Sequence, residues 1–478
     1  MDTINTVLKK YWGIDKLKDK QEELITHFLE NKDVVGLLPT GYGKSLCYML
    51  PPLITNKVIF IISPLISLME DQKEKLIEMN IPVACLHGNN PNKQKEIFSI
   101  IDGNINIVYM SPEYMIQGDG FELADLLMKE ERLGHFAVDE SHCISVWGHD
   151  FRDTYTKLYR FRKNYPTIPI MALTATATET VISDIVKQLN LNEPKIVIAN
   201  FDRPNIYMKC NTIKKFDFDM IDEYINKYEG HKMIIYMNSQ KETVDLSREI
   251  NKKYKNLSEA YHAGMMKQDR NKIQTKFNTG KINIIVSTVA FGMGIDQTVR
   301  CVIIIGSPKS IEEYYQMIGR AGRDGDAAES ILFFRYQNII VNKSMLQKTE
   351  MEQEVKDSKE ASLNKMARYA GINICRRRYI LEYFGQVAKF FWCEYCDNCC
   401  ESKNIDLTKK FVDILFNKKK YDILTKPEIM AAINANLIIE RNGFCQPTTS
   451  LNDWKRKIEV NKYNIKGIPR RYQLMCKK

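Results

Sequence analysis

Short runs of β-branched and apolar residues alternate with longer helical stretches twice along this chain, and that alternation constrains its fold more than any other feature. The first series runs from Val34 to Leu173, and the second from Lys232 to Phe334. Buried strands that alternate with helices are typical of parallel sheets, so we predict two successive α/β units. The predicted strands are Val34–Leu38, Val58–Ile62, Ile105–Met110, Phe136–Val138, Ile170–Leu173, Lys232–Tyr236, Ile282–Ser287, Val299–Ile305 and Ser330–Phe334.

The segments between and after these units differ from them in composition. We expect the linker near Asn200–Asn205, where Pro204 interrupts regular structure. Residues Met345–Tyr383 predict charged helices, and a cluster of cysteines follows them. In the remaining tail, one helix is predicted over Leu407–Phe416. A length of 478 residues agrees with roughly three domains at about 150 residues each.

Charge is distributed unevenly along the chain. Residues 401–478 carry 17 Lys and Arg against 8 Asp and Glu, so nearly all of the net charge of +10 lies in this tail. A basic tail indicates a polyanionic partner, and a solvated charged surface is the alternative. No stretch approaches the ~18 apolar residues of a membrane span, and Met1–Lys10 shows no secretory signal. We therefore expect a soluble intracellular protein without a membrane partner, and the sequence does not distinguish a nuclear from a cytoplasmic location.

A glycine-rich loop, Pro39–Ser45, follows the first predicted strand and precedes an apolar helical stretch. Its glycines let backbone N–H groups close around an anion, and the start of the helix adds a favourable dipole. Lys44 is expected to reach the phosphates, and Ser45 to ligate Mg²⁺. Leu38 occupies the first glycine position of the strict pattern, so a chance glycine turn is the alternative. The candidate phosphate-binding residues are Thr40, Gly41, Gly43, Lys44 and Ser45.

Two acids, Asp139 and Glu140, end a predicted strand about 95 residues further along the chain. Asp139 is suited to hold Mg²⁺ through water, and Glu140 to polarise the attacking water. Buried paired acids without a metal would be costly, and the sequence offers no other partners for them. These acids therefore strengthen the prediction of a nucleotide site.

A third element of the site is the segment Gln316–Gly325, late in the second α/β unit. It carries Arg320 and Arg323 on a turn punctuated by glycines. Arginines there could reach across a cleft to a γ-phosphate, an effect on the order of 10³–10⁵ in rate. Taken alone this turn is equally consistent with a surface loop, but with the other two elements it predicts ATP bound between two lobes.

An aromatic-rich loop directly follows the paired acids. Its candidate nucleic-acid contacts are Trp147, His149, Phe151 and Arg152. Aromatic rings stack on any base for ~1–3 kcal/mol each, and an arginine adds a phosphate or cation–π contact. The position of this loop next to Glu140 offers a route from strand binding to water activation. The alternative is that Trp147 and Phe151 belong to an interlobe core.

Five cysteines cluster close to residue 400, and four of them have the spacing of one tetrahedral structural Zn²⁺ site. An iron–sulfur cluster would want a further cysteine at Lys403. A thiol–disulfide role fits poorly, since no redox domain surrounds the cysteines. Whether Cys399 or Cys400 is the fourth ligand is left open by the sequence. The candidate ligands are Cys375, Cys393, Cys396 and Cys399.

These motifs, in this order, resemble superfamily 2 helicases, and the intervening segments resemble the RecQ family in particular. The likeness covers roughly Thr6–Cys400 and implies that Gln21 contacts adenine, that the four cysteines bind zinc, and that ATP, Mg²⁺ and Zn²⁺ are the cofactors. Segments that carry the resemblance are Trp12–Gly13 with Gln21, Ser63–Gln72, Tyr109–Glu113, Asp139–Arg152, Leu173–Ala177, Phe201–Asn205, Tyr261–Gly264, Thr288–Asp296, Gln316–Gly325 and Arg376–Gly385.

The resemblance also implies a domain organisation. We expect two tandem RecA-like parallel-sheet domains, over 1–204 and 205–344, with ATP bound by the first. A small helical zinc-binding domain is expected over 345–402, followed by a basic C-terminal region over 403–478. In the family a winged helix with a strand-separating hairpin often comes next. Only 78 residues remain here after Cys400, so a reduced winged helix is one interpretation of the tail, in which Lys418–Lys420 and Lys455–Lys457 could contact phosphates.

The implied function is an ATP-dependent DNA helicase that moves 3′ to 5′ on single-stranded DNA and unwinds duplex, as in DNA recombination, repair or replication. An ATPase that remodels RNA is the first alternative, and a nucleic-acid-binding scaffold with a dead motor is the second. The aromatic loop and the zinc cysteines favour DNA, and the intact catalytic residues argue against a dead motor. Protein partners are not indicated. The chain departs from the family pattern at Tyr42, Ser141, Val146 and Asp153, where Gly, Ala, Gln and Pro are usual.

Overall fold

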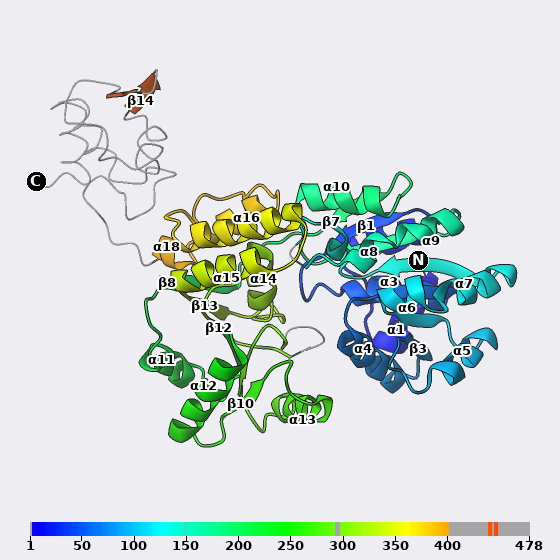
Figure 1. Cartoon of the computed structure of the whole chain (residues 1–478), viewed down its shortest axis with the longest axis horizontal. Helices are drawn as coiled ribbons and strands as arrows, with labels where there is room; N and C mark the ends of the chain where they lie inside the picture. The colour runs from blue at the N-terminus through cyan, green and yellow to red at the C-terminus, as the bar shows by residue number, and fades with distance from the viewer. Residues whose placement is uncertain (1, 149, 292–296, 401–437, 442–443, 448–478) are drawn as a thin grey trace, which may run out of the picture.

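The computed structural model describes residues 2–148, 150–291, 297–400, 438–441 and 444–447. Two parallel sheets with flanking helices lie side by side, and a helical region continues from the second (Figure 1). We call residues 2–198 the first lobe, residues 206–334 the second lobe and residues 336–400 the zinc region. The predicted fold class is confirmed. Among the described residues no helix is long and apolar enough to cross a membrane.

The first lobe contains seven strands, all parallel, in the order β3-β4-β2-β5-β6-β1-β7. Its strands are β1 (Val34–Leu37), β2 (Val58–Ile62), β3 (Val83–Leu86), β4 (Ile107–Met110), β5 (Leu133–Val138), β6 (Ile170–Thr174) and β7 (Lys195–Ile198). Its helices are α1 (Asp2–Trp12), α2 (Asp19–Leu29), α3 (Lys44–Thr55), α4 (Ile66–Glu78), α5 (Lys93–Ile101), α6 (Pro112–Gln117), α7 (Gly120–Lys129), the short 3₁₀ turn Ser141–Ile144, α8 (Asp153–Thr156), α9 (Tyr159–Asn164) and α10 (Glu179–Gln188).

The second lobe contains six parallel strands in the order β10-β11-β9-β12-β13-β8. Its strands are β8 (Ile206–Thr212), β9 (Met233–Met237), β10 (Ser258–Tyr261), β11 (Ile284–Ser287), β12 (Cys301–Ile305) and β13 (Ala328–Phe334). Its helices are α11 (Asp219–Lys227), α12 (Gln240–Lys253), α13 (Lys267–Asn278) and α14 (Ile311–Ile318). The last of these begins with a capping serine, because the Ser310 hydroxyl accepts a hydrogen bond from the N–H of Glu313 at 3.1 Å.

The zinc region is helical, with α15 (Tyr336–Lys348), α16 (Gln353–Ala370), α17 (Arg376–Tyr383) and α18 (Asp397–Cys400). The stretch Met345–Tyr383, predicted as helical, contains the end of α15 and the whole of α16 and α17. Beyond it, the described part of the tail is an antiparallel pair, β14 (Ile438–Arg441) and β15 (Phe444–Pro447). The predicted helix Leu407–Phe416, the reduced winged helix and the lysine clusters of the tail lie outside the described residues.

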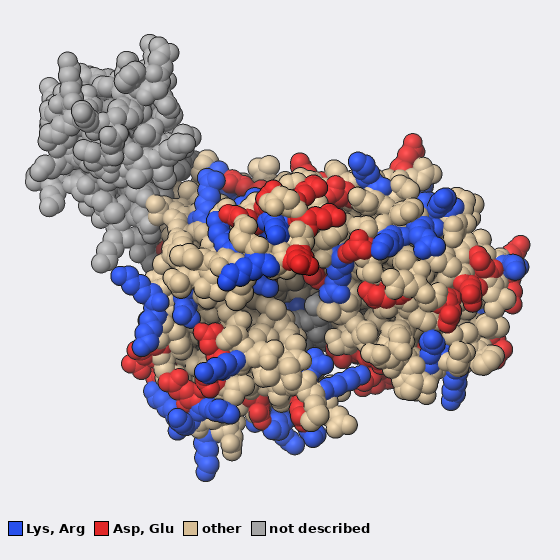
Figure 2. All heavy atoms as spheres, in the orientation of Figure 1, with Lys and Arg blue, Asp and Glu red and all other residues tan. Residues whose placement is uncertain are grey.

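Sequence and packing explain these elements together. Every residue of β2 is buried, because the strand is covered by helices on both faces and consists only of β-branched or aromatic residues. One continuous cluster of buried apolar side chains runs from the first sheet through Phe201 to the second sheet and on to Leu363 and Cys396 of the zinc region. The two lobes and the zinc region therefore share a core. Figure 2 shows acidic and basic side chains interspersed over this body, as its near-neutral charge predicts.

The register of the first sheet decides where the functional loops meet. Strand β1 pairs with β6 from Val34 opposite Met171 to Leu37 opposite Thr174. Strand β6 pairs in turn with β5, so that Val138 lies opposite Ala172. The carboxyl ends of parallel strands lie on one edge of their sheet, where open α/β folds bind ligands. The segments that follow these three strands therefore emerge together.

Candidate active site

The glycine-rich loop joins β1 to α3 as predicted. Gly41 and Gly43 have φ values of +82° and +96°, which lie in the left-handed region that favours glycine. Lys44 begins α3, and its Nζ donates to the carbonyl of Leu38 at 3.3 Å. The loop therefore surrounds the start of a helix with the lysine folded over it, which is the arrangement that binds phosphate oxygens. Ser45 follows in the first turn of the same helix.

Gln21 lies next to this loop. Its side chain is almost fully buried, and its Nε2 donates to the carbonyls of Tyr42 at 3.0 Å and Gly43 at 3.1 Å. The backbone N–H of Lys18 donates to Gln21 Oε1 at 3.0 Å, and the Lys18 ammonium lies 4.8 Å from the centre of the Tyr42 ring. The residue for which the resemblance implies an adenine contact is thus bonded directly to the phosphate loop. Tyr42, which replaces the usual glycine, packs against this lysine.

The two acids lie at the end of β5, facing the start of α3. Asp139 accepts hydrogen bonds from the hydroxyl of Tyr48 at 3.2 Å and from the N–H of Glu140 at 3.0 Å. Burial and then the adjacent Glu140 raise the pKa of Asp139 above its ordinary value, whereas Lys44 lowers it. Glu140 has a φ of +45°, an uncommon left-handed conformation for a residue with a side chain.

A chain of polar side chains leads from Glu140 toward the second lobe. His142 Nδ1 lies 3.4 Å from Glu140 Oε2 and 2.8 Å from the hydroxyl of Thr174. That hydroxyl also accepts from the N–H of Thr176 at 3.2 Å. The hydroxyl of Thr176 in turn accepts from Gln316 Nε2 of α14 at 3.5 Å. Glu140 is therefore linked across the lobes by residues that lie in the segments of the resemblance but were not among the predicted site residues.

The arginine turn of the second lobe lies directly on the phosphate loop. A Cβ placed on Gly41 would stand 3.4 Å from Cγ of Arg323, and one placed on Gly319 would stand 3.1 Å from Cβ of Thr40. Arg320 is buried; its burial lowers the pKa of its guanidinium, whereas Tyr236 and Glu140 raise it. The sequence-predicted residues of both lobes are thus brought together around one site.

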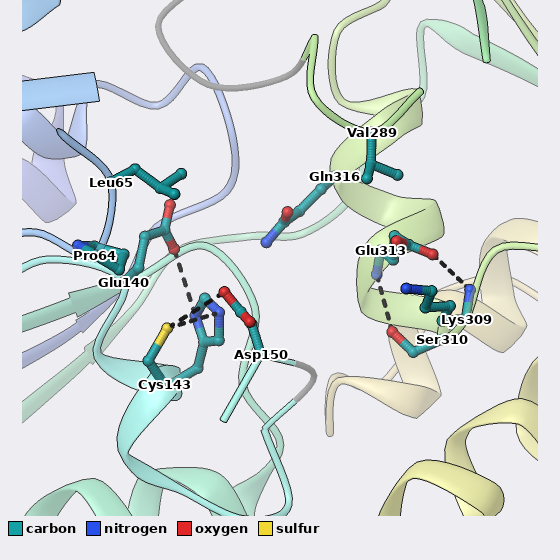
Figure 3. A pocket seen from close by; sticks show the side chains of 11 residues that line it. Pro64, Leu65, Glu140, Cys143, Asp150, Val289, Lys309, Ser310, Glu313 and Gln316 are labelled. Carbon is teal, nitrogen blue, oxygen red and sulfur yellow. Dashed lines mark hydrogen bonds and ion pairs between the residues drawn. The ribbon is translucent and has the colours of Figure 1, made fainter. Parts of the chain in front are cut away.

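A cavity of about 260 Å³ adjoins these residues between the lobes (Figure 3). Glu140 and Asp150 reach it from the first lobe, and Gln316 reaches it from the second. The helix start at Ser310 and the adjacent Lys309 also line it. Because Glu140 and Asp150 both line it, the cavity lies between the hydrolysis site and the aromatic-rich loop.

The aromatic-rich loop is fixed at both ends. Arg152 donates to the carbonyl of Pro64 at 2.9 Å and pairs with Asp150 at 3.1 Å, so its guanidinium is engaged within the protein. A Cβ on Gly148 would stand only 2.1 Å from the carbonyl oxygen of His142, which excludes other residues from this turn. Trp147 is 44% exposed and is not part of an interlobe core. Phe151 is half-buried, and His149 lies outside the described residues.

The predicted cysteine ligands converge. The four sulfur atoms of Cys375, Cys393, Cys396 and Cys399 all lie within 4.8 Å of one another. Four thiolates about 2.3 Å from a zinc ion would stand roughly 3.8 Å apart, so this set fits tetrahedral Zn²⁺. Cys400 is exposed, and its thiol donates to the carbonyl of Glu394 at 3.0 Å. Of the two candidates for the fourth ligand, the geometry therefore selects Cys399.

The zinc region is bonded to two neighbouring parts of the protein, strand β8 and the interlobe linker. Arg376 pairs with Asp397 at 2.5 Å, and Asp397 accepts from the N–H of Cys210 in β8 at 2.9 Å. Arg377 donates to Asp202 of the interlobe linker at 2.6 Å. Thus the metal-binding segments are held against the edge of the second sheet and against the linker.

Comparison with known proteins agrees with this geometry. Three family models match in succession: DEAD/DEAH box helicase over residues 18–185, helicase conserved C-terminal domain over 217–325, and RecQ zinc-binding over 336–400. The ATP-dependent DNA helicase RecQ of Pasteurella multocida is 36% identical over 83% of this chain and 62% of its own length. The ATP-dependent helicase SGS1 of Saccharomyces cerevisiae is 35% identical over 91% of this chain but only 32% of its own length.

A third relative carries a different name. It is a protein of Acanthamoeba polyphaga mimivirus, "Putative ATP-dependent RNA helicase R290", 39% identical over 83% of this chain and 72% of its own length. Among solved structures, DUF1998 helicase MrfA bound to DNA and AMPPNP has a TM-score of 0.58 at 20% identity, covering 74% of this chain and 53% of the other, which supports the fold alone. The motifs, the closed cysteine set and the three successive family matches together mean that this chain belongs to the RecQ family of superfamily 2 helicases.

Proposed function

We propose that this protein is an ATP-dependent DNA helicase that moves 3′ to 5′ on single-stranded DNA and unwinds duplex. The observation that carries the proposal is the contact between Arg323 of the second lobe and Gly41 of the phosphate loop. A nucleotide bound in this loop would touch both lobes, so its hydrolysis would change how they close. That coupling is what a translocating motor requires.

The residues of the site fit ATP and a divalent cation. Lys44 is suited to hold the terminal phosphates, and Ser45 and Asp139 to hold Mg²⁺, which neutralises charge on the phosphates when bound. The buried Asp139 carboxylate, with its raised pKa, is a group that such a cation would stabilise in its ionised form. Glu140 orients the attacking water, and Arg320 and Arg323 stabilise charge on the departing phosphoryl group.

The exposed ring of Trp147 supports a role in contacting unpaired bases. It lies on the loop that begins at His142, the partner of Glu140. Base stacking at Trp147 would therefore act on the turn that positions the water-polarising carboxylate. Arg152, by contrast, has a second role in fixing the loop to Pro64. Partners are single-stranded and duplex DNA, in processes such as recombination or repair.

An RNA-dependent ATPase is the second candidate, and the name of the mimivirus relative favours it. The match to the RecQ zinc-binding family over residues 336–400 favours DNA. The proposed domain boundaries are 1–204, 205–344, 345–402 and 403–478. Since the chain spans only 32–64% of several relatives, functions of their additional regions are not transferred.

One experiment separates these candidates. Strand separation is measured with matched partial duplexes in which the loading strand is DNA or RNA and its overhang is 3′ or 5′. We expect ATP-dependent unwinding on the 3′ DNA overhang and none with Glu140→Gln. Unwinding from an RNA overhang at an equal or greater rate would favour the second candidate, and unwinding only from 5′ overhangs would contradict the direction.

A further inference from the structure

Three side chains of the first lobe that play no part in the ATP site form a separate cluster. Cys85 lies in β3, and His87 follows two residues later, just past the strand. Alternate residues along a strand point to the same face of the sheet, so a Cys-x-His spacing places both side chains together. Glu70 comes from α4, which packs against β3. The fold thus brings together one thiol, one imidazole and one carboxylate.

Their geometry is compact. The ligand atoms of the three residues all lie within 4.8 Å of one another. His87 Nε2 lies 2.9 Å from Glu70 Oε1. Cys85 is fully buried, and the His87 side chain is 6% exposed. Nδ1 of His87 is buried and has no hydrogen-bond partner among the described residues, which leaves a costly polar atom in the interior.

The backbone around Cys85 is held in place by two side chains. Its N–H donates to Oε2 of Glu96 at 2.7 Å, and its carbonyl accepts from the amide of Asn90 at 2.6 Å. Both polar groups of this residue are therefore bound by side chains rather than by a neighbouring strand on that side. Such outer contacts fix the direction in which a ligand side chain points.

The alternative is that no metal binds, that Glu70 and His87 form a buried hydrogen-bonded pair, and that Cys85 serves only as a packed core residue. Burial raises the pKa of the Cys85 thiol, and the Glu70 carboxylate beside it raises it further. A neutral thiol beside a carboxylate needs no cation, so it is the geometry that favours a metal: three ligand atoms converge within 4.8 Å of one another in the interior. The alternative also leaves Nδ1 of His87 without a partner.

We propose that Glu70, Cys85 and His87 form a second Zn²⁺ site, with one oxygen, one sulfur and one nitrogen ligand and a fourth position open to water. This ligand set suits zinc, which binds imidazole, thiolate and carboxylate in tetrahedral geometry. A thiolate and a carboxylate together neutralise the two charges of the ion. The nearby Lys73 is paired with Glu96 at 2.5 Å, so its charge is already compensated. Three protein ligands leave the fourth tetrahedral position to water, unlike the four-cysteine arrangement of a purely structural site.

The position of this site gives it a consequence for the motor. Glu70 belongs to Ser63–Gln72, one of the segments that carry the family resemblance, and Arg152 of the aromatic-rich loop donates a hydrogen bond to Pro64 in the same segment. Zinc held by Glu70 would fix the start of α4 to the end of β3. Zinc binding would therefore restrain the segment to which the aromatic-rich loop is hydrogen-bonded. The metal measurement itself does not depend on the proposed helicase activity.

The test is metal content of the full-length protein, dialysed against buffered free Zn²⁺ and measured by elemental analysis. We expect two equivalents in the parent chain and one in Cys85→Ser, His87→Gln and Glu70→Gln. Cys301→Ser, which alters another buried thiol outside the cluster, should retain two. The Glu70 side chain is 22% exposed, more than that of His87. We therefore expect Glu70→Gln to disturb folding less than the other two substitutions.

Cobalt distinguishes this site from adventitious binding. With Co²⁺ the cysteine-rich site gives thiolate charge-transfer absorption from four sulfurs, and the second site adds absorption from a single sulfur. That added absorption should vanish in Cys85→Ser and persist in Cys301→Ser. Binding should tighten with rising pH, because the Cys85 thiol must lose its proton. One equivalent of zinc in the parent chain at saturating free metal, or two in Cys85→Ser, would overturn the proposal.

Discussion

The side-chain oxygen of Gln386 accepts a hydrogen bond of 2.9 Å from the backbone N–H of Phe201. The amide nitrogen of the same side chain donates to the carbonyl of Ala199 at 2.9 Å. The ring of Phe384 stacks on that of Phe201, with centroids 4.8 Å apart and planes inclined by 15°. The zinc region therefore holds the linker that joins the two lobes, and we expect a change in these contacts to alter how the lobes close on ATP.

Gln386→Ala removes both of these hydrogen bonds and leaves the cysteines in place. A neutral hydrogen bond contributes about 0.5–1.5 kcal/mol, and a loss of ~1 kcal/mol in closure corresponds to a ~5-fold fall in kcat/KM for ATP. We expect that fall in DNA-stimulated hydrolysis, with unchanged zinc content. Lys389→Ala, an exposed change in the same segment, serves as the control. Parental kinetics in Gln386→Ala would mean that these two hydrogen bonds to the linker do not contribute to ATP hydrolysis.

The hydrolysis site gives a second prediction. Lys44→Ala should abolish ATP hydrolysis, because the cation that reaches the terminal phosphates is lost. Glu140→Gln should still bind ATP but hydrolyse it slowly, because the polarising carboxylate becomes neutral. Nucleotide binding and steady-state turnover measure the two effects separately. Lys163→Ala, on the exposed side of α9, should behave as the parent. Substantial turnover in either site variant would contradict the assignment.

The metal centre gives a matched pair of neighbouring cysteines. Cys396→Ser removes a buried member of the set, and Cys400→Ser changes an exposed thiol four residues away. Thiolate ligation of zinc contributes roughly 10–16 kcal/mol in small sites. We expect the first variant to lose the metal, with a lower unfolding midpoint and faster proteolysis between residues 383 and 400. The second should keep both metal and stability. Iron in the purified protein, or equal effects of the two changes, would refute the zinc assignment.

The strands of the two parallel sheets that the sequence missed share one structural property. Strands β3, β7, β8 and β10 were not predicted, and these four are the edges of the two sheets. Central strands are covered on both faces and appear as continuous apolar runs, whereas Lys195–Ile198 has only one buried residue of four. Strand β3 is different: Val83–Leu86 is buried throughout, but its four-residue apolar run is short. The hairpin β14–β15 was also missed, although the sequence Asn442-Gly443 between its strands is a strong signal for a tight turn.

The functional residues were predictable to the extent that local motifs name them. The loop with Lys44, the acids after β5 and the cysteine spacing each carry their chemistry in a few consecutive residues. Contacts between distant segments carry no such signal, which is why the contact of Arg323 with Gly41 and the bonds of Gln386 to the linker had to come from the structure. The selection of Cys399 over Cys400 likewise depended on where the chain turns.

The basic tail is predicted to hold nucleic acid. A chain truncated after Lys403 lacks Asn404–Lys478 but keeps both lobes and all zinc ligands. Each phosphate contact on a single strand contributes ~0.7 to the logarithmic salt slope of binding. We therefore expect weaker DNA binding at low salt, a flatter slope, unchanged basal hydrolysis and a larger loss of unwinding than of single-strand-stimulated hydrolysis. A tail that is only solvated or that docks a protein would leave the slope and unwinding at parental values.

Trp147 tests how DNA contact reaches the hydrolysis site. Its ring is 44% exposed, and its N–H donates to the hydroxyl of Ser145 at 3.1 Å, so the backbone of the loop is held while the ring is free to stack. Trp147→Ala removes no atom of the phosphate site, and basal hydrolysis should stay near the parental rate.

Loss of one stacked base, at ~1–3 kcal/mol, should raise the concentration of single-stranded DNA needed for half-maximal stimulation by about 5–150-fold. Unwinding should fall with it. Tyr159→Ala, which removes an aromatic ring of similar exposure (42%) on α9, is the control and should leave stimulation intact. Parental stimulation in both variants would place the DNA sensor elsewhere in the protein, whereas a selective loss in Trp147→Ala would link base stacking to the turn that carries His142 and Glu140.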